Sequence, residues 1–255
     1  MVKARDMSII IKSSQEIALM RKAGQIVAET LAVLVQALRP GMNSAELDAI
    51  AAREITKRGG IPSFKGYRGY PACVCVSVNE EVVHGIPGNR VLTEGDLVSL
   101  DLGAIYRGFH GDAAVSVGLG KASPLVQELL RTTEGALSAG IAAARAGNRL
   151  GDISAAIQTY AESRGFSVVR EYVGHAIGRE MHEDLQVPNF GVAGRGPLLR
   201  KGMTLALEPM VTAGDWRTKV LEDKWTVVTL DGSLAAHFEH SIAINEDEAE
   251  ILTRL

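Results

Sequence analysis

Apolar residues recur at helical spacing in four stretches of the chain, and these stretches predict two pairs of helices. In the first stretch the repeat is carried by Ile17, Met20, Ile26, Leu31 and Leu34. Pro40-Gly41 ends this helix, and Ser44 is expected to cap the next one. The expected helices span residues 14–38, 45–57, 124–145 and 152–164.

Shorter runs of apolar or alternating residues predict strands between the helix pairs. They lie at 72–78, 97–102, 112–117, 168–173, 203–208, 225–230 and 235–244. The turn residues Tyr106-Arg107-Gly108 join the second run to the third. A hairpin centred on Tyr106 and Arg107 would place Asp101 opposite Asp112.

The second half of the sequence repeats the first. When Gly41 is set on Gly147, the two helix pairs align, and further along Asp101 falls on Glu208. Past an insertion, Asp112 corresponds to Glu239. We therefore expect one α+β domain over residues 1–255, made of two pseudo-symmetric halves at about 14–118 and 122–246. Its simplest form is a central antiparallel sheet with both helix pairs on the outer face and the four acids on the inner face.

Composition narrows the possible partners and the compartment. The net charge of −3 and the lack of a Lys/Arg block argue against nucleic-acid binding. Neither a membrane span nor a signal peptide is evident, so a cytoplasmic protein is expected. Cys73 and Cys75 should lie on one face of a strand as free thiols, which suits a reducing compartment. Met7 is a second possible start, and residues 1–7 are expected to form a loose terminus.

The four acids carry the strongest chemical signal. Asp101 interrupts an apolar strand, Glu208 ends another, and Asp112 and Glu239 each begin an alternating run. Any one of them alone is more simply a surface or salt-bridged residue. Four carboxylates converging on one face, however, cannot be neutralised by one proton, whereas two divalent cations would balance their charge.

The histidines are less informative from the sequence alone. His84 and His175 lie in segments rich in glycine, and the spacing of His175 and His182 is not the helical His-x-x-x-His of zinc proteases. A single histidine is usually a packed or exposed residue. That ordinary interpretation is adopted for His110, His237 and His240.

Several segments together resemble the methionine aminopeptidases of the bacterial type I. The resemblance runs in order from about Ile17 to Ile244, nearly the whole chain. Its motifs are Asn79–Pro87, Asp101, Gly108–Asp112, Gly174–Gly178, His182-Glu183, Leu207–Met210 and Phe238–His240.

The resemblance implies a fold, a set of site residues and an activity. The family fold is the duplicated "pita-bread" α+β fold. The implied metal ligands are Asp101, Asp112, His175, Glu208 and Glu239, with Asp112 and Glu239 bridging two cations. His84 and His182 would be catalytic groups that touch the substrate, and Glu208 would also act as general base. The implied pocket for the methionine side chain consists of Tyr67, Tyr70, Cys75, Met181 and Trp225.

The implied reaction is removal of the N-terminal methionine from nascent polypeptides whose second residue is small. The cations would be two of Co, Mn, Fe or Zn, and the enzyme is expected to be a monomer acting near the ribosome. Three residues depart from the family pattern. Phe64, Ala176 and Met181 stand where Cys, Gly and Phe are common, which leaves the tolerance of the pocket open.

Two alternatives remain at this point. A prolidase or other X-Pro peptidase has the same fold but usually an additional N-terminal domain, for which this chain has no room. A non-enzymatic binding module on this fold would have lost metal ligands, whereas all five are present.

Overall fold

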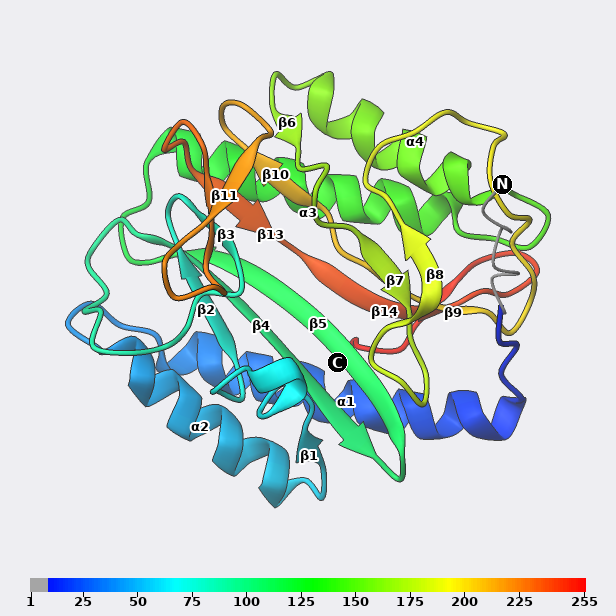
Figure 1. Cartoon of the computed structure of the whole chain (residues 1–255), viewed down its shortest axis with the longest axis horizontal. Coiled ribbons are helices and arrows are strands. Elements are labelled where there is room, and N and C mark those ends of the chain that lie inside the picture. The colour runs from blue at the N-terminus through cyan, green and yellow to red at the C-terminus, as the bar shows by residue number, and fades with distance from the viewer. Residues whose placement is uncertain (1–8) are drawn as a thin grey trace.

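The computed structural model describes residues 9–255 (Figure 1), so the expectation for residues 1–7 lies outside the described part. Two helix pairs cover one face of a large sheet, as expected from the apolar spacing. The helices are α1 (Ser14–Ala37), α2 (Ser44–Lys57), α3 (Pro124–Ala143) and α4 (Leu150–Glu162). Among these elements of residues 9–255, none combines the length and hydrophobicity that crossing a bilayer requires.

The cap of α2 differs from the prediction. Asn43, not Ser44, occupies the N-cap position, and its backbone N–H donates to Glu46 Oε1 at 2.9 Å. The Ser44 hydroxyl is engaged elsewhere, since it accepts a hydrogen bond from the Gly88 N–H at 2.8 Å. Asn and Ser are equally good N-caps, so the sequence could not decide between the two neighbours.

The large sheet has nine antiparallel strands in the order β1-β4-β5-β14-β9-β7-β8, with β2 paired to β4 and β15 to β14. Their bounds are β1 (Ile61–Pro62), β2 (Cys75–Val78), β4 (Leu97–Tyr106), β5 (Phe109–Gly118), β7 (Gly174–Ala176), β8 (Glu183–Val187), β9 (Thr204–Leu207), β14 (Glu239–Ala243) and β15 (Glu250–Ile251).

Two small sheets of three strands each flank the large one. They have the orders β13-β10-β6 and β11-β12-β3. Their bounds are β3 (Glu81–Val83), β6 (Ser167–Val168), β10 (Met210–Thr212), β11 (Thr218–Val220), β12 (Val227–Thr229) and β13 (Ala235–His237), and a short 3-10 turn covers Tyr67–Gly69. The expected strand over 168–173 is wrong beyond Val168. The following residues leave the sheet and bring the Tyr172 ring to 5.7 Å from the His84 ring.

The hairpin of β4 and β5 has a register different from the one predicted. Arg107 and Gly108 form its two-residue turn, and both have positive φ, 49° and 80°. Such primed turns match the twist of the flanking strands. As a result Asp101 pairs with Ala114, two residues beyond Asp112. The two aspartates are therefore diagonal neighbours on one face rather than a directly opposed pair.

The single strand expected over 235–244 is divided at Phe238. Residues before it pair in a small sheet as β13, and residues after it pair in the large sheet as β14. The chain breaks similarly at Glu208-Pro209, and the Phe238 N–H donates to the Pro209 carbonyl at 3.4 Å. These facing breaks bring Glu208 and Glu239 to the same point of the structure.

Corresponding contacts occur in the two halves of the chain. The second helix of each pair begins at a residue that forms a single antiparallel β-bridge with a distant residue. Asn43, before α2, is bridged to Val91, and Arg149, before α4, is bridged to Leu198. These positions are 106 or 107 residues apart, as in the sequence alignment of the halves. The division into halves at 14–118 and 122–246 stays a prediction.

Two apolar clusters join the helices to the large sheet and hold it rigid. One lies under α1 and α2, the other under α3 and α4. Fully buried members include Leu34, Leu47, Leu100 and Leu102 in the first, and Leu129, Ile157, Leu205 and Ile242 in the second. Since burying one such side chain contributes about 1.5–3 kcal/mol, each cluster anchors its part of the sheet firmly.

Cys73 and Cys75 are both free and buried. The expectation that they share a strand face is wrong, because β2 begins only at Cys75. Cys73 packs in the cluster under α1 and α2, whereas Cys75 lies in a separate cluster with Phe64 and Met181.

Candidate metal centre and substrate cavity

The strand register places several acids on the face of the sheet opposite the helices. Asp101 on β4 pairs with Ala114 on β5, and Ala114 pairs with Glu239 on β14. Paired residues point to one side of a sheet, as do residues two apart, so Asp112 shares this face. The small side chain of Ala114 leaves space between the carboxylates.

The second half of the chain adds two more groups to the same face. His175 on β7 pairs with Ala206 on β9, and Ala206 pairs with Ser241 on β14. Ser241 follows Glu239 by two residues, so the His175 side chain points to the side of the acids. Glu208 lies just past the end of β9, with its Oε1 3.6 Å from His175 Nε2.

Two serines tie β5 to the chain on either side of Glu239, one through β14 and the other through β13. The Asp112 N–H donates to Ser241 Oγ at 2.9 Å, and this hydroxyl donates to the Asp112 carbonyl at 2.8 Å. On the other side, the His237 N–H donates to Ser116 Oγ at 2.8 Å, and that hydroxyl donates to the His237 carbonyl at 2.7 Å. The backbone beside both expected bridging acids is thus fixed by hydrogen bonds.

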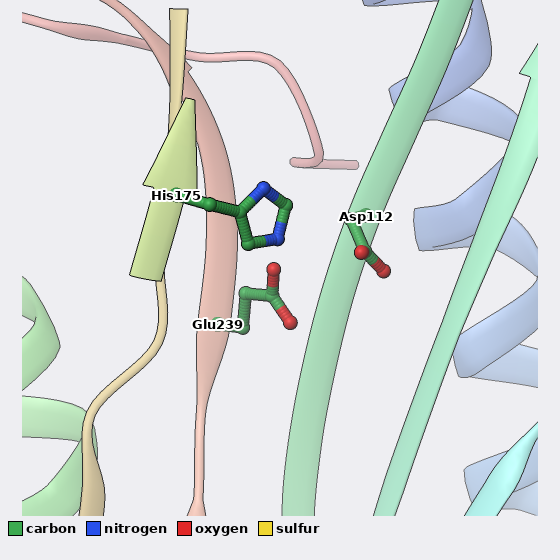
Figure 2. A group of neighbouring side chains, drawn as sticks. All are labelled: Asp112, His175 and Glu239. Atoms are coloured by element: carbon green, nitrogen blue, oxygen red, sulfur yellow. The ribbon is translucent and has the colours of Figure 1, made fainter. Parts of the chain in front are cut away.

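Three of these side chains form a compact group that could hold a metal ion. Asp112, His175 and Glu239 each offer one ligand atom, and these atoms lie within 4.8 Å of one another. Figure 2 shows the three side chains converging from three strands of the large sheet. All three are buried. Asp101 and Glu208 line the same cavity beside them.

Buried carboxylate oxygens of the site lack, among the described residues, the hydrogen-bond partners that would stabilise their charge. Asp101 Oδ1, Asp112 Oδ1 and Glu239 Oε1 are buried without a hydrogen-bond partner in the part of the chain that the structure describes. Burial raises the pKa of Asp112 to about 7. Burial, and then mutual repulsion, also raises the pKa of Asp101, Glu208 and Glu239. Divalent cations would provide the missing partners and reverse these shifts.

His175 is prepared to act as a neutral ligand. Burial, followed by repulsion from His182, lowers its pKa to about 3. Its Nδ1 lies 3.1 Å from the Ala176 carbonyl, so an Nδ1–H would donate there. A hydrogen bond of this kind leaves the Nε2 lone pair free for a metal, which is the usual arrangement of metal-binding histidines.

A cavity of about 150 Å³ opens next to this group. Its wall contains every residue that the sequence suggested for the site, together with Phe64 and Arg68. The lining residues are Phe64, Tyr67, Arg68, Tyr70, Cys75, His84, Asp101, Asp112, His175, Met181, His182, Glu208, Trp225 and Glu239.

One end of the cavity is apolar. The rings of Tyr70 and Trp225 meet edge to face at 5.1 Å, and Tyr70 also contacts Phe64 edge to face at 6.4 Å. The Tyr70 hydroxyl donates to the Gly85 carbonyl at 2.9 Å, which keeps its polar atom satisfied. With Cys75, these side chains form a buried, rigid wall.

His84 and His182 also line the cavity, and the His84 ring lies 6.3 Å from the ring of Trp225. His84 has a φ of 61°, a left-handed conformation that is rare for a residue with a side chain and is found preferentially at functional sites. Burial and the proximity of His182 lower its pKa to about 4. His182 Nδ1 is 2.8 Å from the Tyr67 hydroxyl, and its ring lies 4.2 Å from that of His175.

Two of the histidines given an ordinary interpretation, His110 and His237, are packed side chains that lie beside the site. His237 is buried, its Nε2 is unpartnered among the described residues, and it lies 3.9 Å from a Glu239 carboxylate oxygen. His110 is hydrogen-bonded to Ser63 and contributes to the lowered pKa of His175. Both therefore border the site. The sequence gives no signal for this, because their placement depends on the break at Phe238 and on the hairpin register.

Comparisons with known proteins agree with this geometry. The sequence of residues 18–246 matches the profile of metallopeptidase family M24. Methionine aminopeptidase 1 of Bacillus subtilis is 53% identical over 247 residues, which covers 97% of this chain and all of that protein. Among solved structures, a methionine aminopeptidase from Thermotoga maritima has a TM-score of 0.95 and 51% identity, with 97% of this chain and 100% of that chain covered.

More distant structures share the fold alone. A prolidase from Pyrococcus furiosus has a TM-score of 0.78 at 20% identity. The match covers 97% of this chain but 66% of that prolidase.

Proposed function

This chain belongs to metallopeptidase family M24, and from that membership and the geometry of its cavity we propose that it removes the N-terminal methionine from polypeptides by dinuclear metal-assisted hydrolysis. The observation that carries the proposal is the juxtaposition of buried, unpartnered carboxylate oxygens with a small apolar cavity. The carboxylate oxygens need cations as partners, and the apolar cavity is suited to one uncharged side chain of a substrate.

The residues present are chemically suited to two divalent cations. The ligands would be Asp101, Asp112, His175, Glu208 and Glu239, with Asp112 and Glu239 bridging. Two cations would neutralise four carboxylates, whereas one would leave excess negative charge in a buried site. Oxygen and nitrogen donors without a thiolate suit Mn, Fe, Co or Zn, and availability in the cell decides among these.

When bound, the cations supply Lewis acidity at the peptide carbonyl and a water that is nucleophilic near neutral pH. Glu208 would take up a proton from the attacking water and pass it on as general base. His182, whose Nδ1 is paired with Tyr67, directs its remaining nitrogen toward the carbonyl oxygen, where charge develops. His84 contacts the scissile amide nitrogen.

The apolar end of the cavity would take the methionine side chain. Tyr67, Tyr70, Cys75, Met181 and Trp225 form its wall, and sulfur–aromatic contacts contribute modestly to binding a thioether. These apolar side chains suit one unbranched, uncharged side chain of the substrate. A second substrate residue must be small, since His84 and His182 both have to reach the amide that follows the methionine.

We further propose the cellular setting. The substrates are the N-termini of nascent polypeptides, met near the ribosome in the cytoplasm, and the enzyme acts as a monomer without binding nucleic acid or membrane of its own. The free state of both cysteines and the net charge of −3 are consistent with this setting.

Cleavage of defined peptides tests the proposed specificity. Chelator-stripped protein, resupplied with each metal, should cleave Met-Ala-Ser and not an X-Pro dipeptide, which would be the substrate of a prolidase on the same fold. Replacing Ala by Lys in the second position should lower kcat/KM by ~10²-fold or more, because misplacement by ~1 Å has that effect. Equal cleavage of Met-Ala and Met-Lys peptides, or preference for X-Pro, would reject the proposal.

A further inference from the structure

A buried ion pair lies beside the loop that leads from His175 to His182. Lys12, which precedes α1, pairs with Glu183, the first residue of β8. Their side chains are only 2% and 4% exposed. The Lys12 backbone is fixed as well, since its N–H donates to the Gly202 carbonyl at 2.8 Å. The N-terminal end of the described chain is thus tied to the segment that carries His182.

The ion pair packs directly against this loop. A Cβ atom on Gly178, in the middle of the loop, would collide with the Glu183 carboxylate and with the Lys12 side chain. On its other side, the Gly178 carbonyl accepts a hydrogen bond from the His110 N–H at 2.8 Å. The loop is therefore held between Lys12 and strand β5.

Glu183 is the neighbour of His182 in the chain, so the position of one constrains the other. Glu183 lies opposite Ala176 in the register of β7 and β8, at a point where the pairing is irregular. The strand ladder therefore gives His182 little support of its own. The contact with Lys12 is what fixes the Glu183 side chain. Without a partner at position 12, neither a carboxylate nor an amide at position 183 is held in place, so the adjoining His182 would shift.

We propose that Lys12 is a positioning residue for the reaction: its buried ion pair with Glu183 holds the His182 imidazole against Tyr67 and His175. Lys12 itself touches neither the cavity nor the acids. The inference rests on the proposed function, because it takes His182 to act on the substrate.

The first test compares kinetics, metal content and stability. Lys12→Met should lower kcat for Met-Ala-Ser by roughly tenfold, with KM and bound metal nearly unchanged, because the imidazole is misplaced by less than ~1 Å. Tm should fall by roughly 10 °C, since a buried carboxylate loses its partner. Lys201→Met is the matched control. It removes an exposed ion pair with Glu246, 63% and 71% exposed, and should change kcat by less than about twofold.

A double-mutant cycle separates positioning from general structural support. If Lys12 acts through His182, Lys12→Met should lower kcat by less than about twofold in the His182→Ala background. The same tenfold loss in that background would overturn the proposal. Full activity of His182→Ala alone would overturn both this inference and the role of His182.

A double variant with two uncharged side chains at positions 12 and 183 provides a second test in case Lys12→Met folds poorly. Lys12→Met/Glu183→Gln removes the uncompensated charge and should restore Tm to within a few degrees of the wild type, while kcat stays about tenfold low. Recovery of kcat together with Tm would show that the pair only stabilises the fold. Wild-type protein that does not cleave Met-Ala-Ser would instead count against the proposed function.

Discussion

Replacing Asp112 with Asn should change the stability of the protein in opposite directions with and without bound metal. Asp112 is 5% exposed, and its Oδ1 has no hydrogen-bond partner among the described residues. Burial raises its pKa from 3.8 to about 7 when no cation is present. In metal-free protein near neutral pH, the carboxyl group therefore opposes folding, and an amide does not.

The sign and size of the effect follow from proton linkage. A carboxyl group with a higher pKa in the folded state costs nothing below its unfolded pKa, and the cost grows until the folded pKa is reached. For Asp112 it amounts to about 4 kcal/mol above pH 7 and about 2 kcal/mol at pH 5. In a chain of this size, that predicts a difference in Tm of roughly 10 °C at pH 8 and about half of that at pH 5.

The assay is thermal unfolding of chelator-stripped wild type and Asp112→Asn at pH 5 and pH 8, repeated after metal is added. Comparison of the two proteins at one pH cancels the contribution of the buried histidines. The metal-free variant should be the more stable, by more at pH 8, and the order should reverse with metal. Asp247→Asn, at an exposed carboxylate, should alter neither. A metal-free variant that is less stable than the wild type at pH 8 would refute the reasoning.

Three further variants test individual roles. Glu239→Gln should lose turnover and most bound metal, because the residue is expected to bridge both cations; full activity, measured with metal content, would reject bridging. His84→Ala should keep its metal but lose roughly 10²–10⁴-fold in kcat, as acid–base or positioning groups do; loss of metal would make His84 a ligand instead. Met181→Phe should stiffen the pocket and reduce slow cleavage of norleucine and leucine peptides relative to methionine; unchanged ratios of kcat/KM would show that Met181 does not set the pocket.

The signals that the sequence carried well were local. The apolar repeats located all four helices to within about two residues. An acid inside an apolar strand is costly unless it has a partner, so Asp101 and Glu208 were conspicuous without any knowledge of the fold. Strand parity then sufficed to bring them to one face, which a register error of two residues does not change.

The features that escaped prediction depend on contacts between distant segments. Arg107 adopts a positive φ that its residue type does not favour, so the hairpin was centred one residue too early. The break at Phe238 arises because the residues before and after it pair with two different sheets. The alternation of polar and apolar residues along the chain does not reveal which sheet a residue joins. The ion pair of Lys12 joins residues 171 positions apart, and the motif His182-Glu183 gives no sign that Lys12 is its partner.

Metal titration of chelator-stripped protein tests the dinuclear mechanism most directly. The stripped protein is titrated with Mn or Co while bound metal and cleavage of Met-Ala-Ser are followed in the same samples. We expect two cations per chain at saturation, no cleavage without metal, and activity that returns as the buried acids are neutralised. Cleavage of the peptide by fully stripped protein, or full activity with saturation at one bound cation per chain, would contradict the account.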